Sequence, residues 1–223
     1  MKPEREEKIK QRIIDHLTWD ASVNANDINV TVKNGKVELR GTVQNSTARM
    51  VAGRNAYQVS GVEEVDNYLE IKFPATQTLP VDEEINENIE RILKWNSHID
   101  ASDIQVKTHD NAVSLEGHIG SYWEKYVIEE IVNSVRGVLE VKNSVEVRPK
   151  METRDINIKN DIEQAFERTN LINEKNINVS VEAGMVSLEG AVSSFFVKTQ
   201  AHNIAIYTTG VKDVVDKMTV KYD

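Results

Sequence analysis

The amino-acid sequence predicts an α+β protein made of three tandem modules. One stretch of sixteen residues occurs three times, as INVTVKNGKVELRGTV at 28–43, IQVKTHDNAVSLEGHI at 104–119 and INVSVEAGMVSLEGAV at 177–192. Apolar and polar residues alternate on both sides of a short turn, which is typical of a β-hairpin with one buried face. A segment with helical spacing precedes each hairpin and another follows it. The repeat is therefore a small domain rather than a solenoid unit.

The first helix of each module is predicted from apolar residues that recur every four positions. Such residues form one stripe along a helix, while charged and amide side chains fill the opposite face. Asp82 and Thr153 are plausible N-caps of the second and third copies. The three stripes are Ile9, Ile13 and Leu17; Ile85, Ile89 and Leu93; and Ile158, Ile162 and Phe166.

The hairpin follows this helix. Asn34-Gly35 between two lysines predicts a type I′ turn, because both central residues of that turn have positive φ. Asp110-Asn111 and Ala183-Gly184 are weaker forms of the same signal. In the first copy, the residues predicted to face the core are Ile28, Val30, Val32, Val37, Leu39 and Val43.

A second helix and a last strand complete each module. The helix is expected to begin after Asn45, Ser121 or Ser194, which are good N-cap residues. It is expected to end at a glycine, the residue preferred in a left-handed C-terminal cap. These glycines are Gly61, Gly137 and Gly210, and the last strands run to Ile71, Val147 and Val220.

Each module thus reads helix, strand, strand, helix, strand. The prediction is three tandem αββαβ modules, each a three-stranded mixed sheet covered on one face by two helices. We place them at residues 1–73, 81–148 and 153–223. The intervening spacers, residues 73–80 and 148–152, contain proline and are predicted to be semi-rigid.

The formal net charge of −9 comes from the second and third modules. Lys plus Arg against Asp plus Glu count 11 against 11 in residues 1–74, 8 against 14 in 75–150 and 8 against 11 in 151–223. Nucleic acids and anionic membranes attract basic patches. We therefore expect no nucleic-acid partner and no simple electrostatic docking on an anionic membrane.

The cellular compartment is predicted from what the sequence lacks. It has no cysteine, which favours a reducing compartment and excludes thiol chemistry. The first residues, MKPEREEKIKQRII, contain no apolar run typical of a secretory signal. No segment approaches the roughly 20 apolar residues of a transmembrane helix. We expect a cytoplasmic protein, or a periplasmic one if a leader has been removed.

The repeated hairpin ending in Leu-x-Gly, followed by a helix, Gly-Val and a last strand, resembles the BON family of bacterial osmotic-stress and nodulation proteins. The matching stretches are VELRGTV with GVEEVDNYLEI, VSLEGHI with GVLEVKNSVEV, and VSLEGAV with GVKDVVDKMTV. The resemblance implies modules that bind a ligand or phospholipid in envelope maintenance and stress response. It implies no catalytic residues.

The glycine of the second hairpin strand is the hallmark of that family, and here it is Gly41, Gly117 and Gly190. Glycine inside a strand marks a bulge or a close approach of backbone or ligand. We expect a structural reason, namely that the start of the second helix passes too near for a Cβ atom. A ligand contact is the alternative.

Two pairs of aromatic residues are the best candidates for a contact with a ligand or a membrane. Tyr122-Trp123 and Phe195-Phe196 occupy the same two places at the start of the second helix, where the first module has Ser46-Thr47. Adjacent helical residues point about 100° apart, so one of each pair should be partly exposed. An exposed ring suits a lipid interface or a partner, and the alternative is packing against a neighbouring module.

No cofactor or metal is expected, and no catalytic residue is proposed. The histidines share no repeated position and no ligand spacing; they are His16, His98, His109, His118 and His202. The sequence has no nucleophile motif, phosphate-binding loop or dinucleotide fingerprint. We therefore expect a protein that is not an enzyme.

The predicted function is binding of phospholipid or another small amphipathic envelope ligand in a stress-response role. It rests on the resemblance and on the paired aromatic residues. The alternative is a protein-interaction scaffold or a self-associating adaptor that does not bind lipid.

Overall fold

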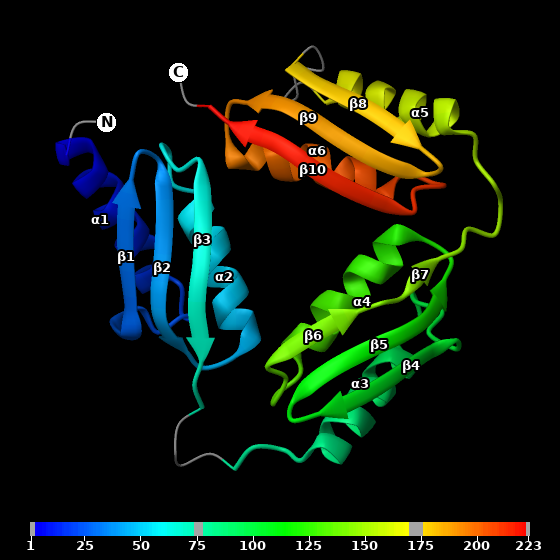
Figure 1. The fold of residues 1–223 in the computed structure, drawn as a ribbon, viewed down its shortest axis with the longest axis horizontal. Coiled ribbons are helices and arrows are strands. Elements are labelled where there is room, and N and C mark those ends of the chain that lie inside the picture. The colour runs from blue at the N-terminus through cyan, green and yellow to red at the C-terminus, as the bar shows by residue number, and fades with distance from the viewer. Residues whose placement is uncertain (1–2, 74–77, 170–175, 222–223) are drawn as a thin grey trace.

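The computed structural model describes residues 3–73, 78–169 and 176–221 and has three modules arranged around a common centre (Figure 1). The first module contains α1 (Pro3–Trp19), the 3₁₀ turn η1 (Ala25–Asp27), β1 (Ile28–Lys33), β2 (Lys36–Val43), α2 (Ser46–Tyr57) and β3 (Glu64–Ile71). The second contains α3 (Asp82–Trp95), β4 (Ile104–His109), β5 (Ala112–Ile119), α4 (Tyr122–Ser134), β6 (Glu140–Asn143) and β7 (Glu146–Val147). The third contains α5 (Asp155–Arg168), β8 (Ile177–Glu182), β9 (Met185–Val192), α6 (Phe195–Tyr207) and β10 (Asp213–Val220). The predicted α+β class with three repeats is confirmed.

Each sheet has the second hairpin strand in the middle. β1 pairs antiparallel with β2, and β3 pairs parallel with β2 on the other side. The other two modules repeat this order, with β7 continuing the edge that β6 begins. Both central residues of every hairpin turn have positive φ, from 48° at Asp110 to 81° at Gly184. The type I′ geometry predicted from Asn34-Gly35 therefore extends to all three copies.

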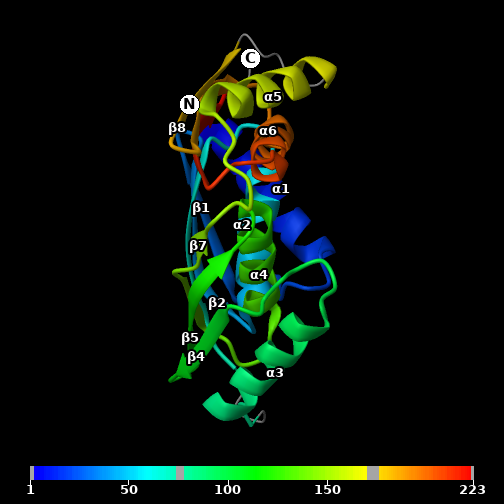
Figure 2. The same cartoon turned by 90° about the vertical axis from the view of Figure 1, so that its right-hand side faces the viewer.

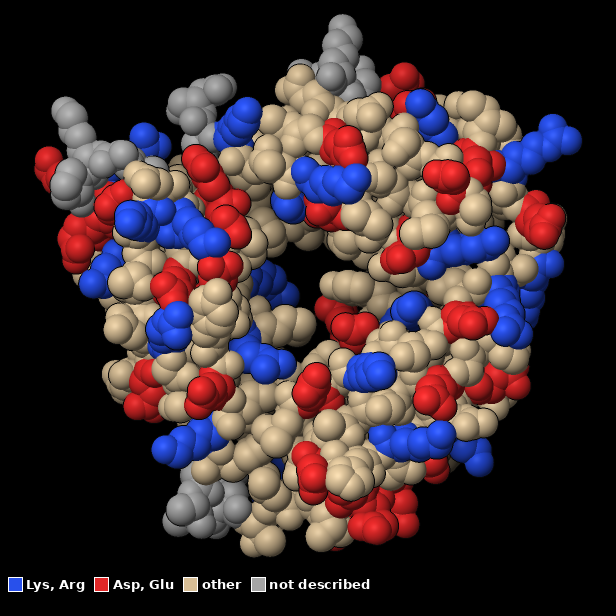
Figure 3. All heavy atoms as spheres, viewed as in Figure 1, with Lys and Arg blue, Asp and Glu red and all other residues tan. Residues whose placement is uncertain are grey.

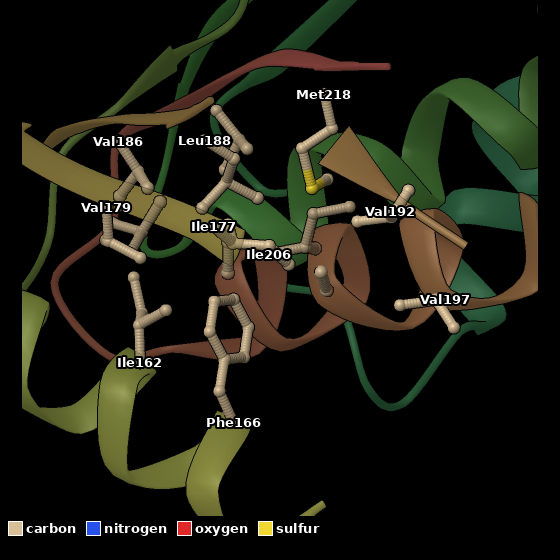
Figure 4. Close-up of a cluster of buried hydrophobic side chains, with 14 of the residues drawn as sticks. Ile162, Phe166, Ile177, Val179, Val186, Leu188, Val192, Val197, Ile206 and Met218 are labelled. Carbon is tan, nitrogen blue, oxygen red and sulfur yellow. The ribbon is translucent and has the colours of Figure 1, made fainter. Parts of the chain in front are cut away.

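Three separate hydrophobic clusters form the cores, one beneath each sheet. The predicted first-helix stripes are buried in every module, and Phe166 is fully buried. Figure 4 shows Ile162 and Phe166 of α5 facing valines and leucine of the third sheet and Ile206 of α6. Two helices therefore cover one face of each sheet, as predicted.

Two predicted helix boundaries are wrong. The second helices end at Tyr57, Ser134 and Tyr207, which lie four, three and three residues before the glycines that were expected to end them. Those glycines have positive φ, but they form the turn that follows the helix. Asp82 and Thr153 are not N-caps either, because the N-caps are Val81 and Arg154.

The carboxylate at the start of the first helix instead holds the hairpin turn. Asp82 accepts hydrogen bonds from the amides of Asp110 and Asn111, both at 2.9 Å. Asp155 accepts from the amides of Ala183 and Gly184 at 2.8 and 2.9 Å. In the first module, Glu6 accepts from the Asn34 amide at 2.9 Å. Helix and hairpin are therefore joined at the same end in all three modules.

A side chain on the third strand bonds its own backbone two residues ahead in every copy. Asn67, Asn143 and Asp216 occupy this position. Their oxygens accept from the amides of Leu69, Val145 and Met218 at 3.2, 3.2 and 2.9 Å. In the second module the strand is interrupted here, between β6 and β7.

The modules form a ring whose two faces differ. The third strands lie nearest the centre and the strands β1, β4 and β8 lie outermost (Figure 1). In the side view the sheets lie on one side of the ring and all six helices on the other (Figure 2). Of the first spacer, residues 74–77 lie outside the described residues, so its predicted rigidity stays a prediction.

Candidate functional site

The four predicted aromatic residues are the first two residues of α4 and of α6. Figure 1 shows these two helices and α2 near the centre of the ring. Each helix presents its first residues to the last turn of a helix in a neighbouring module. The three contacts run in one direction, from α2 to α4, from α4 to α6 and from α6 back to α2. Head-to-tail contacts of this kind close a ring when the rotation between units allows it.

The contact between the first and second modules is polar. The Ser46 hydroxyl donates a hydrogen bond of 2.9 Å to Asn133 Oδ1 at the end of α4. Only 4% of Ser46 is exposed. Buried hydroxyl groups are nearly always hydrogen-bonded, and the partner of Ser46 lies in another module. This hydrogen bond therefore stabilises the contact between α2 and α4.

The contact between the second and third modules is aromatic. Tyr122 and Trp123 both pack against the hydrophobic core of the third module. The Trp123 and Tyr207 rings are near parallel, with centroids 6.3 Å apart and an interplanar angle of 21°. Burial, with the Asp213 carboxylate nearby, raises the pKa of Tyr122 to about 12.

The third contact closes the ring between modules that are distant in sequence. Phe195 stacks on Tyr57 of the first module, with centroids 4.8 Å apart and an interplanar angle of 13°. Offset stacking at this separation is favourable. Ser46, Tyr122 and Phe195 are equivalent positions of the repeat, so one position makes a different contact at each junction.

Phe196 differs from the other three predicted residues because 56% of it is exposed. Trp19 and Trp95 are more exposed still, at 88% and 82%. They occupy equivalent positions at the ends of α1 and α3. A ligand or membrane contact of Phe196 stays a prediction.

A cleft of about 610 Å³ lies between the second and third modules. Trp123 and Tyr207 line it, together with residues 148–151 of the second spacer. Its volume lies in the range of small-molecule sites, about 300–1,000 Å³. An aromatic surface with charged groups around it can accommodate an amphipathic molecule.

Charged groups of both signs line this cleft. Arg148 and Lys150 come from the spacer, and Asp100, Asp103 and Glu124 come from the second module. Some are already paired, since His118 Nε2 lies 3.0 Å from Asp103 Oδ2 and Arg148 Nη2 lies 2.7 Å from Glu146 Oε2. The rest of the surface is mixed as well, and Figure 3 shows acidic and basic side chains interspersed over the sheet face, around a central opening.

The three repeated glycines have matching surroundings. Their φ angles are 125°, 125° and 143° for Gly41, Gly117 and Gly190. A Cβ atom at any of them would lie 2.0 Å from a backbone carbonyl oxygen, that of Asp27, Asp103 or Asn176. The close neighbour is therefore the residue before the first strand and not the start of the second helix, which was the expected one. A ligand contact at these glycines stays a prediction.

Residues 3–73, 78–169 and 176–221 contain neither a group of metal ligands nor a membrane-spanning helix. No group of three or more His, Asp or Glu in these ranges is placed to hold a metal ion. In the same ranges no helix combines the length and the apolar character needed to cross a bilayer.

Comparison with known families finds one family that matches the chain three times. The family model described as the BON domain matches residues 5–72, 81–149 and 154–222. The chain belongs to the BON-domain family. It carries three tandem copies of the domain, which confirms the resemblance seen in the sequence.

One curated protein is similar in sequence to 63% of this BON protein. Osmotically-inducible protein Y of Escherichia coli (strain K12) is 25% identical over 146 residues, which cover 63% of this chain and 73% of that protein.

Solved structures match more distantly. CdsD, a structural protein of the type III secretion system of Chlamydia trachomatis, is 13% identical with a TM-score of 0.28, over 97% of this chain and 93% of that one. The tandem GerMN domains of the sporulation protein GerM from Bacillus subtilis are 13% identical with a TM-score of 0.25, over 98% and 84%. Scores this low support no argument about function.

The sequence did not single out the residues that receive the three contacts between modules. Tyr57, Asn133 and Tyr207 lie in the last turns of α2, α4 and α6 and receive the contacts. A signal was available for the two tyrosines, because both are large rings outside the predicted buried stripe. Asn133 carried no such signal.

Proposed function

We propose that this BON protein acts in the osmotic-stress response without catalysing a reaction, by binding phospholipid or another small amphipathic ligand. The observation that carries the proposal is the cleft between the second and third modules. The cleft has a volume of about 610 Å³, and its lining contains the Trp123 and Tyr207 rings together with cationic and anionic side chains. The similarity to an osmotically inducible protein supports the stress role.

Vesicle flotation tests the binding. We expect the protein to float with phospholipid vesicles, and we expect Trp123→Ala to reduce the floating fraction because it removes a wall of the cleft. Met185→Ala serves as the control, since Met185 is half exposed at the start of β9 in the third module and does not line the cleft. Phe196→Ala reports separately on the exposed ring.

Mass spectrometry after gentle purification identifies any retained ligand. The proposal is overturned if no amphipathic molecule is retained and the folded protein floats with neither zwitterionic nor anionic vesicles. Circular dichroism of each variant distinguishes loss of binding from loss of fold.

A second candidate function is supported by the outer strands. β1, β4 and β8 each end a sheet, so one edge of each is unpaired within its sheet. Such an edge can accept a strand from another protein. A protein partner that is captured reproducibly by the wild type, and lost when Val30 or Val179 is replaced by proline, would favour a scaffold over a lipid-binding protein.

A further inference from the structure

We propose that the cleft between the second and third modules binds a zwitterion whose cationic end is a quaternary ammonium group. The cation lies against the rings of Trp123 and Tyr207, and the anionic end points toward Arg148 and Lys150. This inference rests on the proposed function, because it names the class of ligand for the same cleft.

The aromatic wall supplies the site for the cation. Trp123 is fixed by packing against the core of the third module, while 62% of Tyr207 is exposed. The two rings are near parallel, at 21°, and both line the cleft. Aromatic faces attract cations, and quaternary ammonium groups, which have no N–H to hydrogen-bond with water, are ligands that proteins recognise through such faces.

Two oriented carboxylates add negative charge beside these rings. Glu124 Oε2 accepts a hydrogen bond of 2.5 Å from the Ser121 hydroxyl, and its Oε1 lies 3.5 Å from the Asp100 amide. Asp100 Oδ1 accepts a hydrogen bond of 2.7 Å from the Ser102 hydroxyl. These bonds hold the carboxylates in place, so a bound cation does not have to order them.

The spacer supplies the opposite charge. Arg148 is held by Glu146, whose Oε2 accepts bonds from Nε at 3.2 Å and Nη2 at 2.7 Å. Lys150 lies near enough to attract the Asp100 carboxylate. A ligand of one sign would leave the opposite charges of the lining uncompensated, whereas a zwitterion meets both.

The ligand can come from two sources with the same chemistry. One is a free zwitterion such as betaine, and the other is the phosphocholine headgroup of a lipid. The volume of about 610 Å³ admits either. The experiment must therefore separate a free molecule from a membrane surface.

Tryptophan fluorescence can report on this cleft selectively. The protein has three tryptophans, and Trp19 and Trp95 are exposed and outside the cleft. In the double variant Trp19→Phe, Trp95→Phe, the remaining emission comes from Trp123. We expect betaine to change it in a saturable way, and we expect glycine, which lacks the three methyl groups, to have no effect.

Two substitutions test the roles of the lining residues. Tyr207→Leu removes one aromatic face and should weaken betaine binding about tenfold. Lys150→Gln should weaken betaine binding but leave the binding of tetramethylammonium, which has no anionic end, unchanged. Tyr68→Leu is the control, because this half-exposed tyrosine lies in the first module.

Vesicles of phosphatidylcholine and phosphatidylglycerol separate the sources. Competition of phosphatidylcholine vesicles with betaine indicates a headgroup site, and competition only by soluble phosphocholine indicates a free zwitterion. An equal response to glycine and betaine would overturn the inference, as would no response to betaine or phosphocholine. If flotation persists in that case, the proposed amphipathic binding stands and only the zwitterion is wrong.

Discussion

Gly41, Gly117 and Gly190 determine how closely the chain before the first strand can approach the second strand. Each pairs with the first residue of the neighbouring strand, as Gly117 does with Ile104. A carbonyl oxygen lies 2.0 Å from the position that a Cβ would take. Any other residue must displace backbone, and it must also adopt a φ that favours glycine.

We predict that Gly117→Ala lowers the free energy of unfolding by about 2–4 kcal/mol, because it combines a backbone clash with an unfavourable φ. Gly120→Ala is the matched control three residues away. Its Cβ would meet only the flexible Glu124 side chain, at 3.4 Å. Urea unfolding measures both, and equal stability of the two variants would contradict the explanation.

His202 is a partly buried histidine of the third module, and the equivalent positions of the other two modules hold no histidine. Burial lowers its pKa below the usual value of 6.5, Asp216 opposes this, and Lys198 adds to it. His202 Nδ1 lies 4.0 Å from Asp216 Oδ2, and it has no hydrogen-bond partner among the described residues. The equivalent residues are Gly53 and Glu129, so the other modules cannot titrate in the same way.

A lowered pKa gives a definite sign to the pH dependence. The folded protein favours neutral His202, so this stabilisation is complete above pH 6.5 and is lost as the pH falls toward the lower folded-state pKa. We predict that His202→Asn reduces the loss of stability in this window. The same substitution at exposed His98 is the control for replacing a histidine by asparagine, and urea unfolding at a series of pH values measures both variants.

At the scale of elements, the acid at the start of the first helix joins that helix to the hairpin. Asp82 and Asp155 each accept two turn amides, and Glu6 accepts one. Hydrogen bonds to a charged acceptor are stronger than neutral ones.

We predict that Asp82→Asn destabilises the second module by about 1–3 kcal/mol, because the amide nitrogen of Asn cannot accept a hydrogen bond from one of the two turn amides. Glu83→Gln is the control, since it removes a charge from the same helical turn without touching the hairpin. Hydrogen exchange at Asp110 and Asn111 provides the local measurement. Unchanged protection of these amides would show that the carboxylate does not hold the turn.

The elements were predictable because each repeats a local pattern. Alternation predicted both hairpin strands, and spacing of four predicted the first helices with the residues that they bury. The predicted C-terminal ends of the second helices were wrong because a glycine after a helix can either cap the helix or lie in the turn that follows it. The side-chain bond at Asn67, Asn143 and Asp216 was missed because a polar residue within a predicted strand carries no signal for a bond to its own backbone.

At the scale of the molecule, three chemically different contacts close one ring. A serine–asparagine hydrogen bond, an aromatic contact with a neighbouring core and an aromatic stack join the modules in one direction. Because each junction has its own chemistry, each module fits best beside its own neighbour. The ring also forms the cleft, whose lining comes from two modules and the spacer between them.

The sequence could not predict this arrangement. It placed Tyr122, Trp123, Phe195 and Phe196 at equivalent positions, but the residues that they meet are in other modules, without a repeated spacing to connect them. The sequence predicted one partly exposed ring in each pair and left packing against a neighbouring module as the alternative. Three of the four rings contact a neighbouring module.

Cysteine cross-linking tests the ring most directly, because the natural chain has no cysteine. Ser46 and Asn133 lie in different modules and their side-chain oxygens are 2.9 Å apart. The control pair joins Ser46→Cys to Ser180→Cys, on an outer strand of the third module. The ring predicts that Ser46→Cys with Asn133→Cys forms a disulfide within the monomer under mild oxidation, while the control pair does not. An Asn133 pair that stays reduced, or that links only separate molecules, would contradict the junction between α2 and α4, without which the ring cannot form.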